Sequence, residues 1–240
     1  MTGRAFRRAV SKPYYFREII TQMDTIGVGS LMIITLTGAF TGGILALNTA
    51  PTLKTFGATS VTGQLVMTSL VREMGPVLSA LMTAGRVGSA IAAELGSMVV
   101  SEQVDAMRAL GTDPIRKLVA PRMLALLIKL PLLTVLADCV GIGGGAFAAT
   151  SLYGLSMGEF LTSVREGIST DDIIGGVIKP TCFALIIGAV ACYKGLNTEG
   201  GTVGVGRSTT RAVVTASIVV IISDFFLARA LQYLLGMQAN

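Results

Sequence analysis

"SLVREMGPVLSALMTAGRVGSA", residues 69–90, is an apolar run long enough to cross a bilayer. Three charged residues interrupt it: Arg72, Glu73 and Arg86. A helix of about 20 apolar residues spans a hydrocarbon layer of about 30 Å, and a charge near the centre of that layer costs about 2.5 to 3.5 kcal/mol on insertion scales. We therefore expect these three side chains to face protein, water or lipid headgroups rather than acyl chains.

The composition of the whole chain is that of a membrane protein. Of the 240 residues, 52% are hydrophobic and 14% are charged, whereas about 25% of the residues in soluble domains are charged. Several stretches reach the length of a membrane-spanning helix, and none alternates like a strand of a transmembrane barrel. We predict an all-α integral membrane protein, with one transmembrane domain over residues 1–240. Its five predicted spans are about 25–47, 64–98, 118–147, 173–193 and 211–235.

Basic residues are distributed unevenly among the segments that connect these spans. They gather before the first span, between the second and third spans, and between the fourth and fifth spans. The other side has only Lys54, Arg165 and, near the end of the fifth span, Arg229. The positive-inside rule then predicts a multi-pass protein with a cytoplasmic amino terminus and a carboxyl terminus on the opposite side.

The first residues of the chain combine basic and apolar side chains. Phe6, Val10, Phe16 and Ile20 recur at helical spacing, with arginines between them. This pattern predicts an amphipathic helix over residues 1–24 that lies along the cytoplasmic membrane surface. A solvated basic leader is the alternative interpretation.

Small residues recur every four positions along the second span, and this spacing lets a neighbouring helix backbone approach closely. The residues in this row are Ala80, Ala84, Gly88, Ala92 and Gly96. The first and third spans repeat the spacing at Gly38, Gly42, Gly141 and Gly145. The pattern predicts tight helix packing and has no functional meaning by itself.

The charged pair of the second span stands directly before a Gly-Pro sequence. Arg72 and Glu73 are adjacent, so on a helix they point in different directions. Pro76 should free a carbonyl of the preceding turn and bend the helix. Two roles remain open for the pair: lining a cavity for an amphiphile with a polar head, or buried structural ion pairing.

Three further carboxylates of the predicted spans are expected to have structural roles. We expect Glu94 to cap the cytoplasmic end of its helix, and Asp138 and Asp224 to accept hydrogen bonds from nearby hydroxyls.

A short polar helix is predicted between the second and third spans, within residues 101–113. Ser101 can cap its start and Gly111 can end it. Its charged residues, which are either available to a partner protein or only solvated, are Glu102, Asp105 and Arg108.

Two other segments, residues 201–208 and 148–172, have patterns that predict local structure. "GTVGVGRS", residues 201–208, has glycine spacing reminiscent of a phosphate loop, but no strand precedes it and an arginine replaces the lysine. We predict a loop that leads to a helix cap at Ser208 or Thr209. Residues 148–172 carry apolar residues at helical spacing with charges between them, which predicts a surface-lying helix.

The residue types argue against chemistry by this chain alone. It contains no histidine, the commonest general base and metal ligand. Cys139, Cys182 and Cys192 lie in apolar segments without metal-ligand spacing, so we expect buried hydrophobic residues and no disulfide. We predict no catalytic residue, no metal site and no nucleic-acid partner.

Three stretches carry a resemblance to a known family. "LVREMGPVLSALMTAGRVGSAIAAELG" (70–96), "EQVDAMRALGTDPIRKLVAPR" (102–122) and "RSTTRAVV" (207–214) are similar to the MlaE-type permeases. These are the membrane subunits of lipid-transporting ABC systems that work with MCE-domain proteins. The similarity covers roughly residues 24–235.

The resemblance implies a set of partners and a location. It implies a homodimer in the inner membrane that binds two cytoplasmic ABC ATPase subunits, with a periplasmic MCE-domain assembly on the other side. ATP and Mg would bind to the ATPase, so this chain would hold no cofactor. The implied function is phospholipid transport between the inner membrane and an MCE channel.

The resemblance also implies site residues. The family's Arg-Glu pair corresponds to Arg72 and Glu73, at a lipid cavity in the dimer interface near the outer leaflet. Apolar cavity positions correspond to Leu45, Leu53 and Phe56. The segment 101–113 resembles the family's coupling helix, which rests on the ATPase; its implied contact residues are Glu102, Asp105, Arg108 and Gly111. Met107 departs from the broader loop pattern of ABC importers, where an alanine is usual.

Two other classes of protein remain as alternatives. An ion-coupled secondary transporter would use the intramembrane carboxylates, but it would be expected to show an inverted repeat, and none is evident. A scaffold subunit that only anchors other proteins would keep the polar helix and need no charges in a cavity.

Overall fold

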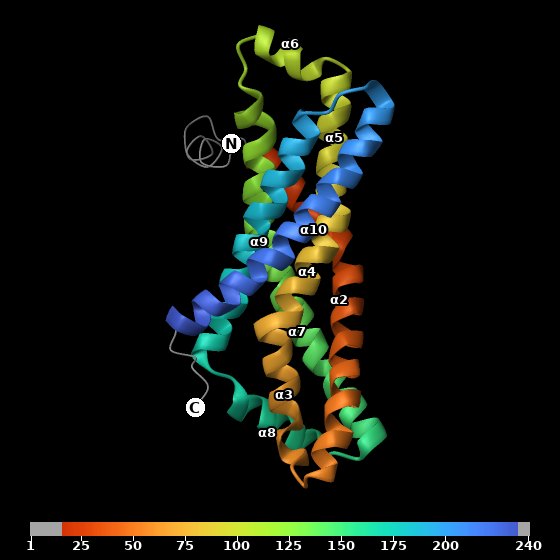
Figure 1. Cartoon of the computed structure of the whole chain (residues 1–240), viewed down its shortest axis with the longest axis vertical. Helices are drawn as coiled ribbons and strands as arrows, with labels where there is room; N and C mark the ends of the chain where they lie inside the picture. The colour runs from red at the N-terminus through yellow and green to blue at the C-terminus, as the bar shows by residue number, and fades with distance from the viewer. Residues whose placement is uncertain (1–15, 235–240) are drawn as a thin grey trace. The chain divides into compact units, whose positions relative to one another are not determined.

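The computed structural model describes residues 16–234, which form helices and no strand (Figure 1). Five helical stretches in this part of the chain are long and apolar enough to cross a membrane: Glu18–Thr55, Thr59–Val100, Ile115–Tyr153, Thr170–Leu196 and Gly201–Leu234. The predicted all-α membrane class and the five spans are confirmed. The stretches extend beyond the predicted spans because helical hydrogen bonding continues into the polar flanks, which a search for apolar residues does not include.

The helices have the following bounds. They are α2 (Phe16–Thr55), α3 (Thr62–Ser69), α4 (Gly75–Thr83), α5 (Ser89–Val100), α6 (Gln103–Ala109), α7 (Ala120–Tyr153), α8 (Met157–Gly167), α9 (Thr170–Leu196) and α10 (Gly201–Leu234). A short 3₁₀ turn, Thr59–Val61, precedes α3. Three π-helical turns, at Leu70–Met74, Ala84–Gly88 and Ile115–Val119, join or precede helices. The second span is therefore α3, α4 and α5 linked by two π turns.

The residues group into two compact units, and each long helical stretch contributes a part to both. The unit that contains α6, the α6 unit, comprises Met1–Ser30, Ala80–Leu130 and Thr181–Asp224. The unit that contains α8, the α8 unit, comprises Leu31–Ser79, Pro131–Pro180 and Phe225–Asn240.

The row of small residues in the second span forms the packing surface of the α6 unit. All five members, from Ala80 to Gly96, are buried. A Cβ on Gly88 would lie 3.5 Å from Ile187 of α9, and the backbone of Ala92 lies close to Gly195 at the end of the same helix. A row of residues four apart drifts by about 40° per step around an α-helix. The wider π turn at Ala84–Gly88 takes back part of that drift, because it holds more residues per turn.

The glycines of α2 and α7 bring two backbones into contact in the α8 unit. A Cβ on Gly42 would overlap the carbonyl oxygen of Gly141, and a Cβ on Gly38 would meet the backbone of Ala137. Only residues without a side chain permit this approach. The tight packing expected from this spacing is therefore present.

The helix α8 differs from the prediction for residues 148–172. The preceding helix continues to Tyr153, and α8 begins after a capping box formed by Ser156 and Glu159. Phe160 is buried against α3 in a cluster with Val66 and Leu70, so only part of the apolar face of α8 is exposed. The segment forms a helix but is also a core element, because the aromatic ring completes the packing of α3.

Two other expectations have different outcomes. Residues 201–208 are already helical, so the predicted loop and the cap at Ser208 or Thr209 are wrong. The turn before α10 is made by Gly200 and Gly201, whose φ angles of 87° and 66° suit glycine. The amphipathic helix predicted over residues 1–24 lies largely outside the described residues, and its last part is continuous with α2.

Candidate functional site

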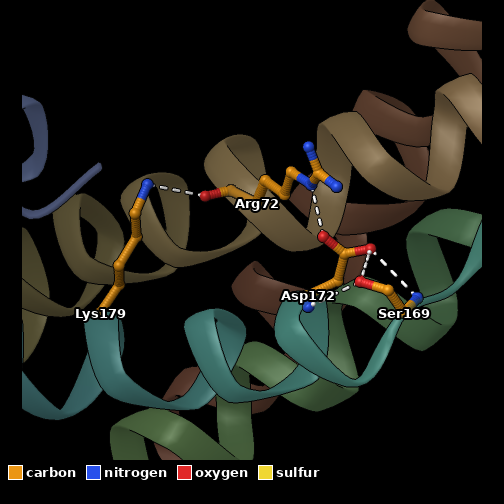
Figure 2. A network of polar contacts seen from close by, with 4 residues as sticks. All are labelled: Arg72, Ser169, Asp172 and Lys179. Atoms are coloured by element: carbon orange, nitrogen blue, oxygen red, sulfur yellow. Dashed lines mark hydrogen bonds and ion pairs between the residues drawn. The ribbon is translucent and has the colours of Figure 1, made fainter. Parts of the chain in front are cut away.

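The charged pair of the second span lies in the π turn Leu70–Met74. Pro76 has no N–H, so it cannot donate to the carbonyl of Arg72 four residues earlier, as an α-helix would require. The Nζ atom of Lys179, on α9, donates to that carbonyl at 2.7 Å instead (Figure 2). The carbonyl that the proline was expected to free is thus bonded by a charged side chain from another helix.

Arg72 is held by an aspartate at the start of α9. Its Nε atom donates to Oδ1 of Asp172, whose side chain is fully buried (Figure 2). The other oxygen, Oδ2, accepts from the hydroxyl of Ser169 at 2.8 Å and from its backbone N–H at 3.2 Å. The N–H of Asp172 in turn donates to the Ser169 hydroxyl. This reciprocal capping box fixes the orientation of the carboxylate that accepts from Arg72.

Glu73 pairs with the same lysine that bonds the Arg72 carbonyl. Nζ of Lys179 donates to Oε2 of Glu73 at 2.8 Å. The lysine side chain is only 4% exposed, whereas that of Glu73 is 46% exposed. A buried ammonium is costly unless it is paired, so Lys179 depends on these two acceptors.

A pocket opens beside the two ion pairs. Its lining residues are Arg72, Glu73, Asp171, Asp172, Gly175, Lys179, Ala228, Leu231 and Gln232. Its cavity is small, about 30 Å³, whereas small-ligand clefts are about 300 to 1,000 Å³. The pocket can therefore contact part of a polar group but cannot enclose a lipid.

The arginine presents unused donors at this pocket. Its side chain is 45% exposed, and among residues 16–234 its side-chain hydrogen bonding is limited to Nε. In Figure 2 one terminal nitrogen points away from Asp172, and the dashed line from the guanidinium to Asp172 starts at Nε. Arg72 and Glu73 form ion pairs and also line a pocket, while their role toward an amphiphile stays a prediction.

Asp172 and Lys179 are site residues that the sequence interpretation did not single out. They are seven positions apart on α9, so they share a helix face. The fourth span predicted from apolar content, 173–193, begins just after Asp172 and contains Lys179. One pattern in the sequence could have identified them. Asp172 and Lys179 have opposite charges, lie at helical spacing and stand at the start of an apolar run.

The apolar residues implied for a lipid cavity do not line this pocket. Leu45 packs against the buried cluster around Phe160, Leu53 is half-buried, and Phe56 is 78% exposed. Their role as cavity residues stays a prediction.

The segment 101–113 contains the short helix α6. Glu102 takes the left-handed conformation, with φ 58°, at its start. The expected cap by Ser101 is wrong, because that hydroxyl donates to the carbonyl of Ser97. Asp105 and Arg108 pair at 2.8 Å on the exposed surface.

The end of α6 is sharply defined. Gly111 has φ +73°, and its N–H donates to the carbonyl of Arg108 while that of Thr112 donates to Met107. These two bonds form a Schellman motif, so Gly111 ends the helix as expected. Val104 is the buried anchor of α6, and Leu110 is 83% exposed beside the glycine. Contact with an ATPase stays a prediction.

Two further carboxylates differ from expectation. Glu94 lies inside α5 and accepts from Nη2 of Arg122 at 2.8 Å, so it pairs with α7 instead of capping a helix end. Asp138 lies against Gly75, where a Cβ would overlap its carboxylate. Oδ1 of Asp138 accepts no hydrogen bond from the described residues, which contradicts the expected hydroxyl partner.

Comparison with known proteins identifies the class. Five apolar helices with ion pairs between them are typical of membrane transport subunits, and residues 19–230 match the family described as Permease MlaE. The chain belongs to the MlaE permease family, which is a family of transporter subunits rather than enzymes.

Several relatives are similar over almost the whole chain. A probable ABC transporter permease protein of Synechocystis is 41% identical over 95% of this chain and 87% of the relative. The intermembrane phospholipid transport system permease protein MlaE of Haemophilus influenzae is 39% identical, over 94% of this chain and 89% of its own length. The chloroplastic protein TRIGALACTOSYLDIACYLGLYCEROL 1 of Arabidopsis thaliana is 35% identical over 95% of this chain and 65% of the relative.

Proposed function

We propose that this chain is the permease subunit of an ABC transporter that moves phospholipids between the inner membrane and an MCE-protein channel. The family supports this proposal, and so does the Haemophilus relative, which is a permease protein of an intermembrane phospholipid transport system. Two copies would form the membrane part, with cytoplasmic amino termini and periplasmic carboxyl termini. A separate cytoplasmic ATPase would bind ATP and Mg.

One observation carries the choice of ligand: the fixed, half-exposed guanidinium of Arg72. Asp172 holds Nε and leaves the terminal nitrogens for a ligand. A guanidinium fork suits a phosphate group, which it can bind through two parallel hydrogen bonds. The arginine lines the pocket beside it, where such a group could approach.

The remaining residues of the pocket would position that arginine and complete the cavity. Lys179 neutralises Glu73 and holds the backbone of the π turn. In the dimer, acyl chains would lie against apolar walls that include Leu45, Leu53 and Phe56. The headgroup end would be polar and the chain end apolar, as an amphiphile requires.

ATP would act on this site through α6. The exposed surface of α6 offers the Asp105–Arg108 pair and the apolar side chain of Leu110 to the ATPase. A ligand shifts a conformational equilibrium only through different affinities for the two states. Nucleotide must therefore act through the ATPase contact, which would shift the packed helices and squeeze lipid from the cavity.

A transport assay with the reconstituted complex tests this function. Arg72→Gln removes the charge and the fork, and we expect at least about a tenfold fall in ATP-driven phospholipid transfer, since a hydrogen bond to a charged group contributes about 1.5 to 3 kcal/mol. Arg165→Gln, at an exposed arginine of α8 outside the pocket, is the matched control and should leave transfer unchanged. Equal transfer by both variants would reject the pocket as the lipid site.

The same assay separates the alternatives. A secondary transporter would move lipid without ATP when an ion gradient is applied, and a scaffold would support no transfer that depends on Arg72. Pairing of Glu73 with Lys179 also leaves this carboxylate poorly suited to carry a coupling ion.

A further inference from the structure

A second polar pocket lies in the α6 unit, around an arginine that the proposed function does not use. Arg86 belongs to the π turn Ala84–Gly88, and such turns occur frequently at functional sites. The pocket is lined by Gln22, Thr25, Ile26, Arg86, Val87, Ala90, Ile91 and Glu94. Its cavity is about 70 Å³, compared with about 30 Å³ for the pocket at Arg72.

The backbone of α2 makes room for this arginine. A Cβ on Gly29 would overlap the guanidinium, so the side chain lies directly against a glycine. Arg86 is nevertheless an exposed residue, so this contact does not enclose it. The guanidinium is therefore supported on one side and accessible on the other.

Arg86 has little compensation for its charge. Within residues 16–234 its side chain makes one hydrogen bond, from Nη1 to the hydroxyl of Ser30 at 3.4 Å. Charge-assisted hydrogen bonds are usually 2.7 to 2.9 Å long. An ionisable residue in a membrane span is expected to face a partner or a ligand, because leaving it in lipid is costly.

The carboxylate of the pocket is already occupied. Glu94 accepts from Arg122 at 2.8 Å, and Arg122 also donates to the carbonyl of Leu118. Among the described residues that line the pocket, Arg86 and Glu94 are the ionisable ones, and the carboxylate of Glu94 is neutralised by Arg122 from outside the lining. The charge of Arg86 is therefore left for an anion.

We propose that the pocket at Arg86 is a second anion site, which binds the phosphodiester of a phospholipid headgroup through the guanidinium, with Gln22 and Thr25 as polar neighbours. The lipid nature of the ligand rests on the proposed function, and the anion chemistry rests on the pocket. In the proposed orientation this site serves the half of the membrane nearer the cytoplasm, so lipid has a separate binding position there.

Photocrosslinking of the purified full-length complex in detergent tests the site without any transport step. A photoreactive phenylalanine derivative replaces Ala90, which lines the pocket and is exposed. The probes are dioctanoylphosphatidylglycerol and dioctanoylglycerol, which have the same tails and differ in the phosphoglycerol headgroup. We expect saturable crosslinking with the first probe only, and Arg86→Gln should raise its half-saturating concentration by about tenfold or more.

Matched variants keep this result interpretable. Arg211→Gln removes an exposed cation of the same unit outside the pocket and should change nothing. Arg86→Lys keeps the charge but lacks the guanidinium fork, so this variant should bind the phospholipid probe with intermediate affinity. It replaces Arg86→Gln in the comparison if that variant does not fold. Arg72→Gln should leave crosslinking at Ala90 intact, so failure of the proposed function and failure of this site are separate outcomes.

Three results would overturn the proposal. The first is equal half-saturation in the parent and in Arg86→Gln. The second is equal crosslinking by dioctanoylglycerol, which would indicate an apolar surface. The third is full protection by inorganic phosphate at the concentration of the lipid, which would indicate a site for the free ion.

Discussion

Lys179 bonds two acceptors of the second span at once, the Arg72 carbonyl and the Glu73 carboxylate. We expect Lys179→Met to destabilise the protein, because both acceptors lose a charged donor. Breaking a fully buried pair costs about 3 to 5 kcal/mol, and the half-exposed Glu73 can regain water, so we expect about 2 kcal/mol. Thermal unfolding of the purified protein in detergent measures this loss as a lower Tm.

A double variant supplies the control for this prediction. Glu73→Gln combined with Lys179→Met removes both charges, so it should recover part of the lost Tm. Additive effects of the two single variants would contradict a direct interaction between these side chains.

The residues of the site were predictable only in part. Arg72 and Glu73 stand out because a charge in an apolar run is costly wherever it occurs, and this is a local property. Their partners Asp172 and Lys179 lie about 100 positions away. No periodicity connects two helices that far apart, because their contact depends on how the helices pack in three dimensions.

Helix contacts follow the glycine pattern closely in the pair α2 and α7. We expect Gly42→Ala to destabilise the protein by about 1 to 3 kcal/mol, because the added methyl would overlap the Gly141 backbone and overpacking costs that much. Gly43→Ala is the matched control, since its Cβ would be 3.7 Å from the nearest atom. The Tm values of the two variants test this prediction, and equal values would contradict the close contact between Gly42 and the Gly141 backbone.

The ends and the internal turns of the helices were less predictable than their positions. Apolar content located all five spans, but it placed the start of α10 about ten residues too late, because Gly201 and its polar neighbours still form a helix. The π turns were not expected at all. A π turn uses the same residue types as an α turn and differs only in its hydrogen-bonding pattern. Hydropathy therefore does not reveal it.

At the scale of the assembly, the exposed side chain of Leu110 offers the clearest test of coupling. We expect Leu110→Asp to reduce copurification with the ATPase and ATP-driven transfer together, since a charge would enter an apolar contact. The Tm of the permease should stay the same, because this side chain is 83% exposed. Leu161→Asp, at an exposed leucine of α8, should leave the bound ATPase unchanged, and equal loss in both variants would contradict the role of α6.

The class of the whole molecule was accessible from sequence because a membrane imposes one strong rule. Every span must satisfy its backbone internally and carry an apolar surface, so Glu18–Thr55 and its counterparts are visible as hydropathy alone. Exposed residues such as Phe56 and Leu110 carry no comparable signal. A side chain that meets lipid and one that meets a second subunit can have the same chemistry.

The π turn at Leu70–Met74 restricts the length of the chain as much as its composition. Removal of a single residue there would restore ordinary α-helical hydrogen bonding, and the helix beyond the turn would keep nearly its original register. The side chains within the turn would change direction, so the guanidinium would leave its aspartate even though Arg72 and Asp172 were both still present. Tolerance of substitutions and intolerance of deletions should therefore coexist in this short segment.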